Sequence, residues 1–129
     1  SVAEGDRANL ITDDNRRLYV NDAHPNRWAV RENYAAAQTN NQLKAAPGAG
    51  LRLYITDIVM STDTAMNIKL VEDTAGTPAD VAGPYYFAAN GGIAMPFKTP
   101  LALTANTDLG FTSSAAGNHT VEVHGFIAP

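Results

Sequence analysis

The stretch Leu51-Arg52-Leu53-Tyr54-Ile55-Thr56-Asp57-Ile58-Val59-Met60 is the strongest strand signal in the chain and decides its fold class. Successive residues of a strand point to opposite faces, and here both faces carry apolar side chains. A strand of this kind is typically central in its sheet or covered by another subunit. The predicted faces hold Leu51, Leu53, Ile55 and Val59 on one side and Tyr54, Ile58 and Met60 on the other.

Asp57 interrupts the face that carries Leu53, Ile55 and Val59. Three interpretations stay open at this point. Asp57 is a buried, hydrogen-bonded carboxylate, or the partner of a cation such as Arg52 on a neighbouring subunit, or part of an exposed strand end.

Short segments with strand character recur on both sides of this stretch, separated by residues that favour turns. Asn90-Gly91-Gly92 is the clearest turn, because Asn and Gly tolerate positive φ. No longer window repeats its apolar residues with a helical period. The sequence therefore predicts an all-β protein, a β-sandwich or jelly-roll-like domain of about eight short antiparallel strands. Besides 51–60, the predicted strands are 28–34, 42–46, 66–71, 85–87, 93–97, 101–104, 108–112 and 120–128.

The length of 129 residues suits one domain. Residues 1–26 are polar and irregular, and we expect them to form an extended N-terminal arm with a short strand at 16–20. Residues 27–129 are expected to form the β-sandwich domain.

Composition narrows the possible functions. Only 17% of residues are charged and 45% are hydrophobic, which favours a protein that covers part of its surface with partners. The net charge is −4 with no basic stripe, so we expect no nucleic-acid binding. No apolar run approaches the ~18 residues of a membrane span, so we expect no membrane insertion. The absence of cysteine excludes disulfides and thiolate metal sites.

No set of residues predicts chemistry, so the chain is predicted not to be an enzyme and to have no catalytic, cofactor-binding or metal-binding residues. His119 and His124 should lie on opposite faces of one strand and cannot share a metal, and we expect these histidines, with His24, to be solvated or packed in loops. None of the serines lies in a Gly-x-Ser-x-Gly turn. The aromatic run Tyr85-Tyr86-Phe87 is expected to supply core packing and one interfacial tyrosine, with a stacking platform for sugars as the alternative.

Residues 46–61, with a Gly-containing turn before a long strand, and residues 83–97 resemble small virion proteins of tailed phages. The Leu101-x-Leu103 strand and the closing Val121-x-Val123-x-Gly125 strand are similar to the same group. The resemblance implies a capsid decoration (cement) protein with a jelly-roll-like body that often forms homotrimers. It further implies binding to major capsid protein subunits, capsid stabilisation, and a place on the virion surface after assembly in the host cytoplasm. A tail- or fibre-associated module that binds a receptor or glycan is the alternative, and the group implies no active-site residues.

Overall fold

The computed structural model describes residues 26–129, which fold into eight strands without a helix. The predicted arm, apart from Asn26, and its predicted strand at 16–20 lie outside the described residues. Every strand pair is antiparallel, so the predicted all-β sandwich is confirmed. The strands are β1 (Arg27–Tyr34), β2 (Asn41–Lys44), β3 (Arg52–Thr62), β4 (Met66–Glu72), β5 (Ala79–Phe87), β6 (Gly92–Ala102), β7 (Leu109–Ser113) and β8 (His119–Ala128).

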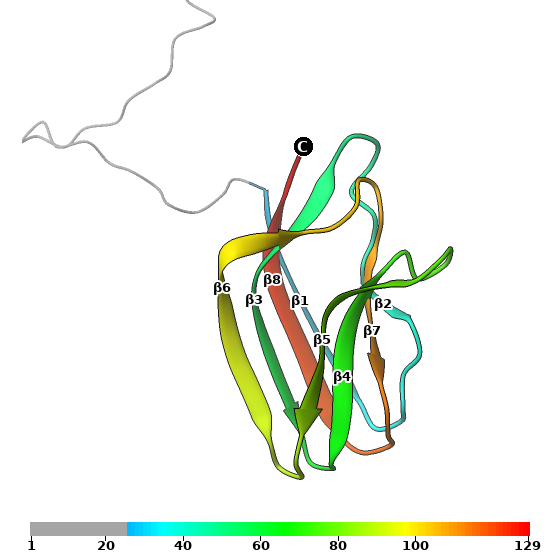
Figure 1. Cartoon of the computed structure of the whole chain (residues 1–129), viewed down its shortest axis with the longest axis vertical. Helices are drawn as coiled ribbons and strands as arrows, with labels where there is room; N and C mark the ends of the chain where they lie inside the picture. The colour runs from blue at the N-terminus through cyan, green and yellow to red at the C-terminus, as the bar shows by residue number, and fades with distance from the viewer. Residues whose placement is uncertain (1–25) are drawn as a thin grey trace, which may run out of the picture.

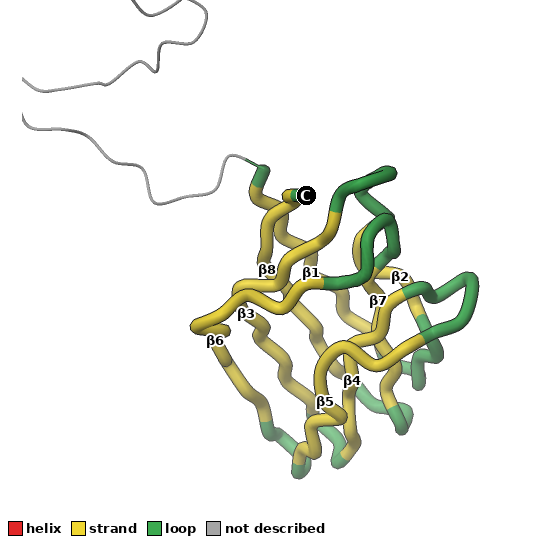
Figure 2. The backbone as a smooth tube through the Cα atoms, turned by 45° about the horizontal axis from the view of Figure 1, so that its top comes forward, coloured by secondary structure: helices red, strands yellow, loops and turns green. Residues whose placement is uncertain are grey.

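The strands form two four-stranded sheets that face each other (Figures 1 and 2). One sheet has the order β1-β8-β3-β6 and the other β2-β7-β4-β5. The paired strands include β1·β8, β2·β7, β3·β6 and β4·β5. These pairs arise when one long hairpin wraps into a barrel-like sandwich, with β1–β4 on one side of the hairpin and β5–β8 on the other. This strand order is that of a jelly roll.

β3 lies between β8 and β6, so its predicted central position is confirmed. Its predicted faces are wrong beyond Ile55. The register shifts between Ile55 and Asp57, and this β-bulge reverses the alternation. Leu53 and Ile55 before the bulge point into the core, and after it Ile58 and Met60 do so. Asp57 consequently lies on the outer face of the sheet and no longer interrupts an apolar row.

β6 joins two segments that the sequence analysis separated, 93–97 and part of 101–104. The predicted strands leave out residues 98–100, and Pro100 among them cannot donate a ladder hydrogen bond. β6 is an edge strand, however, and an edge strand tolerates proline because one side of it needs no partner. β5 likewise begins six residues earlier than the predicted 85–87 segment, since Ala79–Phe87 includes polar residues, Gly83 and Pro84 that hide its strand character.

The core fills the space between the sheets with side chains that are almost fully enclosed. Trp28 on β1 packs over Gly125 on β8, and Phe111 on β7 lies 5.5 Å from Tyr34, ring centroid to ring centroid. His119 belongs to the same group: it is 3% exposed and its ring lies 6.1 Å from that of Phe111. The prediction that His119 is solvated or packed in a loop was therefore wrong. The largest buried side chains are Phe111, Leu53, Ile55, Ile58, Met60, Ile68, Leu70, Leu103 and Leu109.

Candidate interaction surface

Strand β6 is the least charged edge of the sandwich. Of its 11 residues, only Lys98 carries a charge. Its inward-pointing side chains Ile93, Met95 and Phe97 pack against the core but stay partly exposed, because β6 is the last strand of its sheet within residues 26–129. The strand thus presents apolar side chains that the isolated chain covers only in part.

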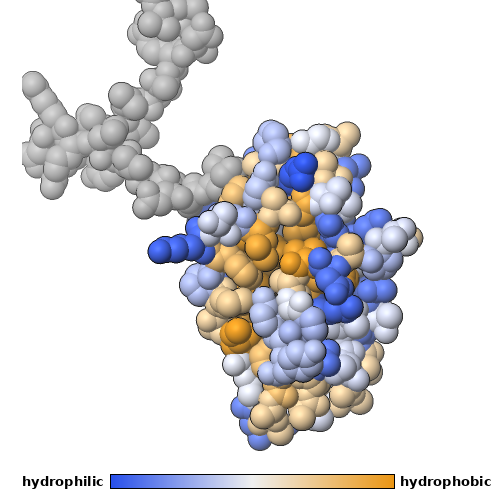
Figure 3. Space-filling view, viewed as in Figure 1, coloured by the Kyte–Doolittle hydropathy of each residue, from blue (hydrophilic) through white to orange (hydrophobic). Residues whose placement is uncertain are grey.

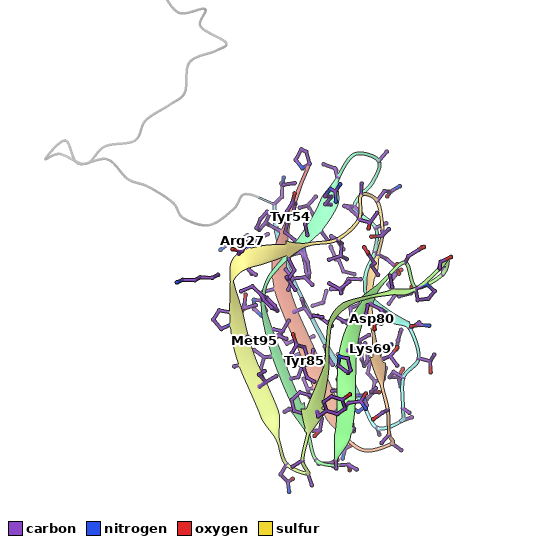
Figure 4. All side chains as sticks on the ribbon, in the orientation of Figure 1. Arg27, Tyr54, Lys69, Asp80, Tyr85 and Met95 are labelled. Carbon is purple, nitrogen blue, oxygen red and sulfur yellow. The ribbon has the colours of Figure 1, made fainter. Side chains whose placement is uncertain are left out.

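β5 occupies the matching edge of the second sheet, and residues 88–91 connect it directly to β6. Its inward-pointing Tyr85 and Phe87 are also only partly buried against the core. In the space-filling view apolar atoms are visible between these two strands (Figure 3). The stick view labels Met95 from β6 and Tyr85 from β5, one from each side (Figure 4). We call this region the β5–β6 edge: Tyr85, Phe87, Ile93, Met95, Phe97 and Leu101.

Tyr85 is enclosed enough for its ionisation to be affected. Burial raises the pKa of the Tyr85 phenol above its ordinary value of 10.0, because the phenolate would lose hydration there. Its neighbour Tyr86 points the other way and is 79% exposed. Tyr85 and Phe87 thus supply the expected core packing, while the interfacial role expected of one tyrosine stays a prediction.

The apolar character continues from β6 onto the outer face of its sheet. Val59 pairs with Ala94 across β3 and β6, and Val59 is 39% exposed. A shallow depression of about 200 Å³ lies over this pair. It is lined by Thr56, Asp57, Ile58, Val59, Ala94, Met95 and Pro96. Apolar residues therefore lie on both sides of β6.

Two opposite charges, Asp57 and Lys98, flank this surface, and neither has an ionic partner within residues 26–129. Asp57 pairs with Pro96 in the sheet register, two residues from Lys98. The Asp57 carboxylate accepts a hydrogen bond from Thr56 Oγ1 at 2.7 Å. Within residues 26–129 the ion pairs are Lys69–Asp80 and His124–Glu122, and neither includes Asp57 or Lys98.

Arg52 Nη1 donates to the Leu103 carbonyl at 3.1 Å. The pairing of Arg52 with a neighbour's Asp57 that the sequence suggested stays a prediction.

The outer strands of both sheets are poor templates for adding another strand. Pro96 and Pro100 remove two donors from β6, and Pro84 removes one from β5. β2 has only four residues. On β1, Glu32 takes an inward-pointing position of the alternation yet stays exposed, and such a charge discourages pairing at an edge. Contacts with other molecules are thus directed to side chains and away from the main chain.

A second depression, of about 600 Å³, lies where the turns after β1, β3 and β7 meet. Its polar groups largely satisfy one another. Asp63 accepts hydrogen bonds from Thr64 Oγ1 at 2.9 Å and from Asn118 Nδ2 at 2.8 Å, and Thr120 Oγ1 donates to Asn33. The side-chain hydrogen bond from Thr64, followed by that from Asn118, lowers the pKa of Asp63 below its ordinary value of 3.8. These groups stabilise the turns.

His119 and Thr62, which line this depression, carry buried polar atoms. His119 Nδ1 lies 2.7 Å from the Gly117 carbonyl, so Nδ1 carries a proton and donates. Its Nε2 and the Thr62 hydroxyl are buried and have no hydrogen-bond partner among residues 26–129. His119 points inward and His124 outward, as predicted from their spacing. Residues 26–129 contain no group of three His, Asp or Glu side chains that could hold a metal ion.

The strand pattern alone did not single out the β5–β6 edge or Lys98. A signal was present, because Pro96 and Pro100 within an apolar run mark an edge strand, and an edge strand with apolar residues on both sides needs cover.

The described part of the chain contains no helix long and apolar enough to cross a membrane. No protein-family model, curated protein or solved structure matches this chain.

Proposed function

We propose that this protein is a structural component of a virion, a decoration (cement) protein that binds the outside of a phage capsid through contacts with major capsid protein subunits. The observation that carries the proposal is the β5–β6 edge, an apolar and almost uncharged surface on a jelly roll whose outer strands resist strand addition. Such a surface is suited to packing side chains against other folded subunits, which for a decoration protein include neighbouring copies of the chain as well as capsid subunits. The resemblance of residues 46–61 and 83–97 to small virion proteins supports the same function.

The proposed attachment uses the N-terminal residues as well as the body. Residues 1–26 are rich in polar residues, and a polar segment that orders on binding can wrap a large surface. In a homotrimer three such arms act together, so weak single contacts add up to firm attachment. The shell gains stability without any covalent chemistry.

The experiment is a binding assay with capsid shells of the phage that encodes the chain, assembled without this protein. Full-length protein is expected to bind in many copies per shell and to raise the temperature at which the shells disrupt. Deletion of residues 1–20 is expected to leave the folded body intact, as judged by its circular dichroism, while binding to shells is lost. Unchanged binding of the deletion variant contradicts attachment by the arm, and absence of full-length binding contradicts the proposed function.

A glycan- or receptor-binding module of a tail or fibre is the second candidate, and the exposure of Tyr86 is what favours it. An aromatic ring that is 79% exposed on an outer strand can stack against a sugar ring. Glycan-array binding that is lost in Tyr86→Ala, together with a low copy number per virion, would support this candidate over decoration. Shell binding that survives Tyr86→Ala supports decoration.

A further inference from the structure

We propose that copies of this chain associate through the β6 side of the sandwich, with Asp57 of one copy paired to Lys98 of the next. The inference rests on the proposed function, in which the protein acts as an oligomer, and identifies the surface and the ion pair that hold the copies together.

The proline residues of β6 limit the kind of partner that this strand can accept. β6 is a poor template for an added peptide strand, because Pro96 and Pro100 offer no main-chain donors. The partner must instead use its own side chains to cover Val59, Ala94 and the partly exposed row to which Met95 belongs. A preformed, folded surface does this without the entropic cost of ordering a peptide.

The charges beside β6 indicate that the folded partner is another copy of this chain. Asp57 on β3 pairs with Pro96 on β6, and Lys98 follows two residues later in the part of β6 that has no register partner on β3. Neither the anion nor the cation has an ionic partner within the described residues. A surface that carries both charges is complementary to itself after rotation, so two copies can each supply what the other lacks. Such pairs set orientation and oppose wrong partners, since like charges in contact cost several kcal/mol.

The apolar surroundings make the pair effective. The depression beside Asp57 is lined mainly by aliphatic groups, and a covering copy would exclude water from it. Coulomb attraction strengthens as the local dielectric falls, whereas an exposed pair contributes little. The isolated chain leaves these groups hydrated, so the ion pair forms together with the interface.

The test uses the full chain and charge reversal. Sedimentation velocity over a wide concentration range measures association of the wild type, Asp57→Lys, Lys98→Asp and the double variant. Each single reversal is expected to weaken association at least about tenfold, because it places like charges in contact. The double variant is expected to recover association to within about threefold of wild type, since it restores opposite charges. Lys44→Asp on β2 makes the same charge change as Lys98→Asp on a different edge strand, and is the matched control.

Mixing the two single variants separates pairing between copies from pairing within one chain. Position 57 of Asp57→Lys then meets position 98 of Lys98→Asp with opposite charges, and association returns. It returns fully in a dimer, whereas in a trimer of the two variants one of three interfaces stays mismatched. If Asp57 and Lys98 paired only within one chain, mixing would restore nothing.

Ala94→Lys provides a variant that leaves the hydrogen bonds of Asp57 in place. Ala94 is exposed on the outer face, so this change is expected to lower association while the urea midpoint of the monomer stays the same. Wild type that stays monomeric at every concentration overturns the inference, and so does a double variant that associates no better than the singles. A monomer that still binds capsid shells would refute this interface while leaving the proposed function standing, whereas an oligomer that ignores shells would do the reverse.

Discussion

Gly125 is the position in the core that leaves least room for a side chain. A Cβ atom there would lie 1.9 Å from the Tyr54 carbonyl oxygen and 2.6 Å from the Trp28 ring. Both contacts are far inside van der Waals distance, and the first involves the backbone of the central strand β3. The glycine therefore allows the Trp28 ring to pack directly over β8.

Gly125→Ala is expected to destabilise the body by about 3 kcal/mol, at the upper end of the usual cost of overpacking a core. Urea unfolding followed by tryptophan fluorescence measures this directly, since Trp28 is the sole tryptophan of the chain. His124→Ala, which changes an outward-facing residue of the same strand, is expected to cost less than about 1 kcal/mol. Equal unfolding midpoints for Gly125→Ala and wild type would contradict the close packing of Trp28 on β8.

Asp63 offers a residue-scale test of the turn hydrogen bonds. Its pKa is lowered in the folded state, so its contribution to stability is present at pH values above the unfolded pKa and is lost as the pH falls through the folded pKa. NMR titration of its carboxyl carbon is expected to give a midpoint below 3.8. Thr64→Ala removes the largest cause and should move the midpoint upward more than removal of the Asn118 amide does. A midpoint that does not respond to Thr64→Ala would rule out this hydrogen bond as the cause.

At the scale of the element, the β-bulge in β3 determines which residues face the core. Strict alternation from Leu53 would turn Val59 inward and Ile58 outward, whereas the bulge between Ile55 and Asp57 buries Ile58 fully and exposes Val59. An aspartate is therefore tolerated at one of these neighbouring positions and excluded at the other.

Ile58→Asp is expected to lose more than about 4 kcal/mol or to remain unfolded, because it buries a charge without a partner. Val59→Asp is expected to change the free energy of unfolding of the monomer by less than about 1 kcal/mol, as for other substitutions outside the core. Urea titrations followed by circular dichroism give both values. Strict alternation predicts the opposite ranking, so an Ile58→Asp variant that is more stable than Val59→Asp would contradict the bulge.

The strands themselves could be predicted closely from the sequence, because alternation and turn residues are local signals. β1, β4 and β8 match their predicted ranges to within a residue or so. The bulge in β3 and the continuity of β6 through Pro100 could not be predicted, because both depend on which strands lie alongside. A bulge is a mismatch between two strands, and a proline is tolerated only where one side of its strand is open.

At the scale of the whole molecule, a sandwich or jelly roll follows from many short strands, but the strand order does not. The order β1-β8-β3-β6 arises from contacts between residues far apart in the chain, which a local pattern does not contain. The β5–β6 edge is a consequence of that order, since it consists of the two strands that end up last in their sheets. The sequence placed Asp57 on an apolar face, whereas the bulge turns it to the outer face of the sheet. Its position beside Pro96 follows from the strand register, which the sequence alone does not contain.

If the copies associate through this edge, the stability of the whole molecule depends on protein concentration. Anything that binds the folded state alone stabilises it by mass action, and for a trimer a tenfold rise in concentration adds about 1 kcal/mol per chain. For a domain of this size that corresponds to a rise of roughly 4 °C in the midpoint of thermal unfolding.

Differential scanning calorimetry at two concentrations tenfold apart measures this shift for wild type and for Lys98→Asp. Wild type is expected to show the rise, and Lys98→Asp, which associates weakly, is expected to unfold at nearly one temperature. Salt at 1 M should reduce the wild-type shift. It screens the attraction between Asp57 and Lys98, which are both hydrated in the separated copies. A shift of the same size in Lys98→Asp would mean that association proceeds through another face of the sandwich.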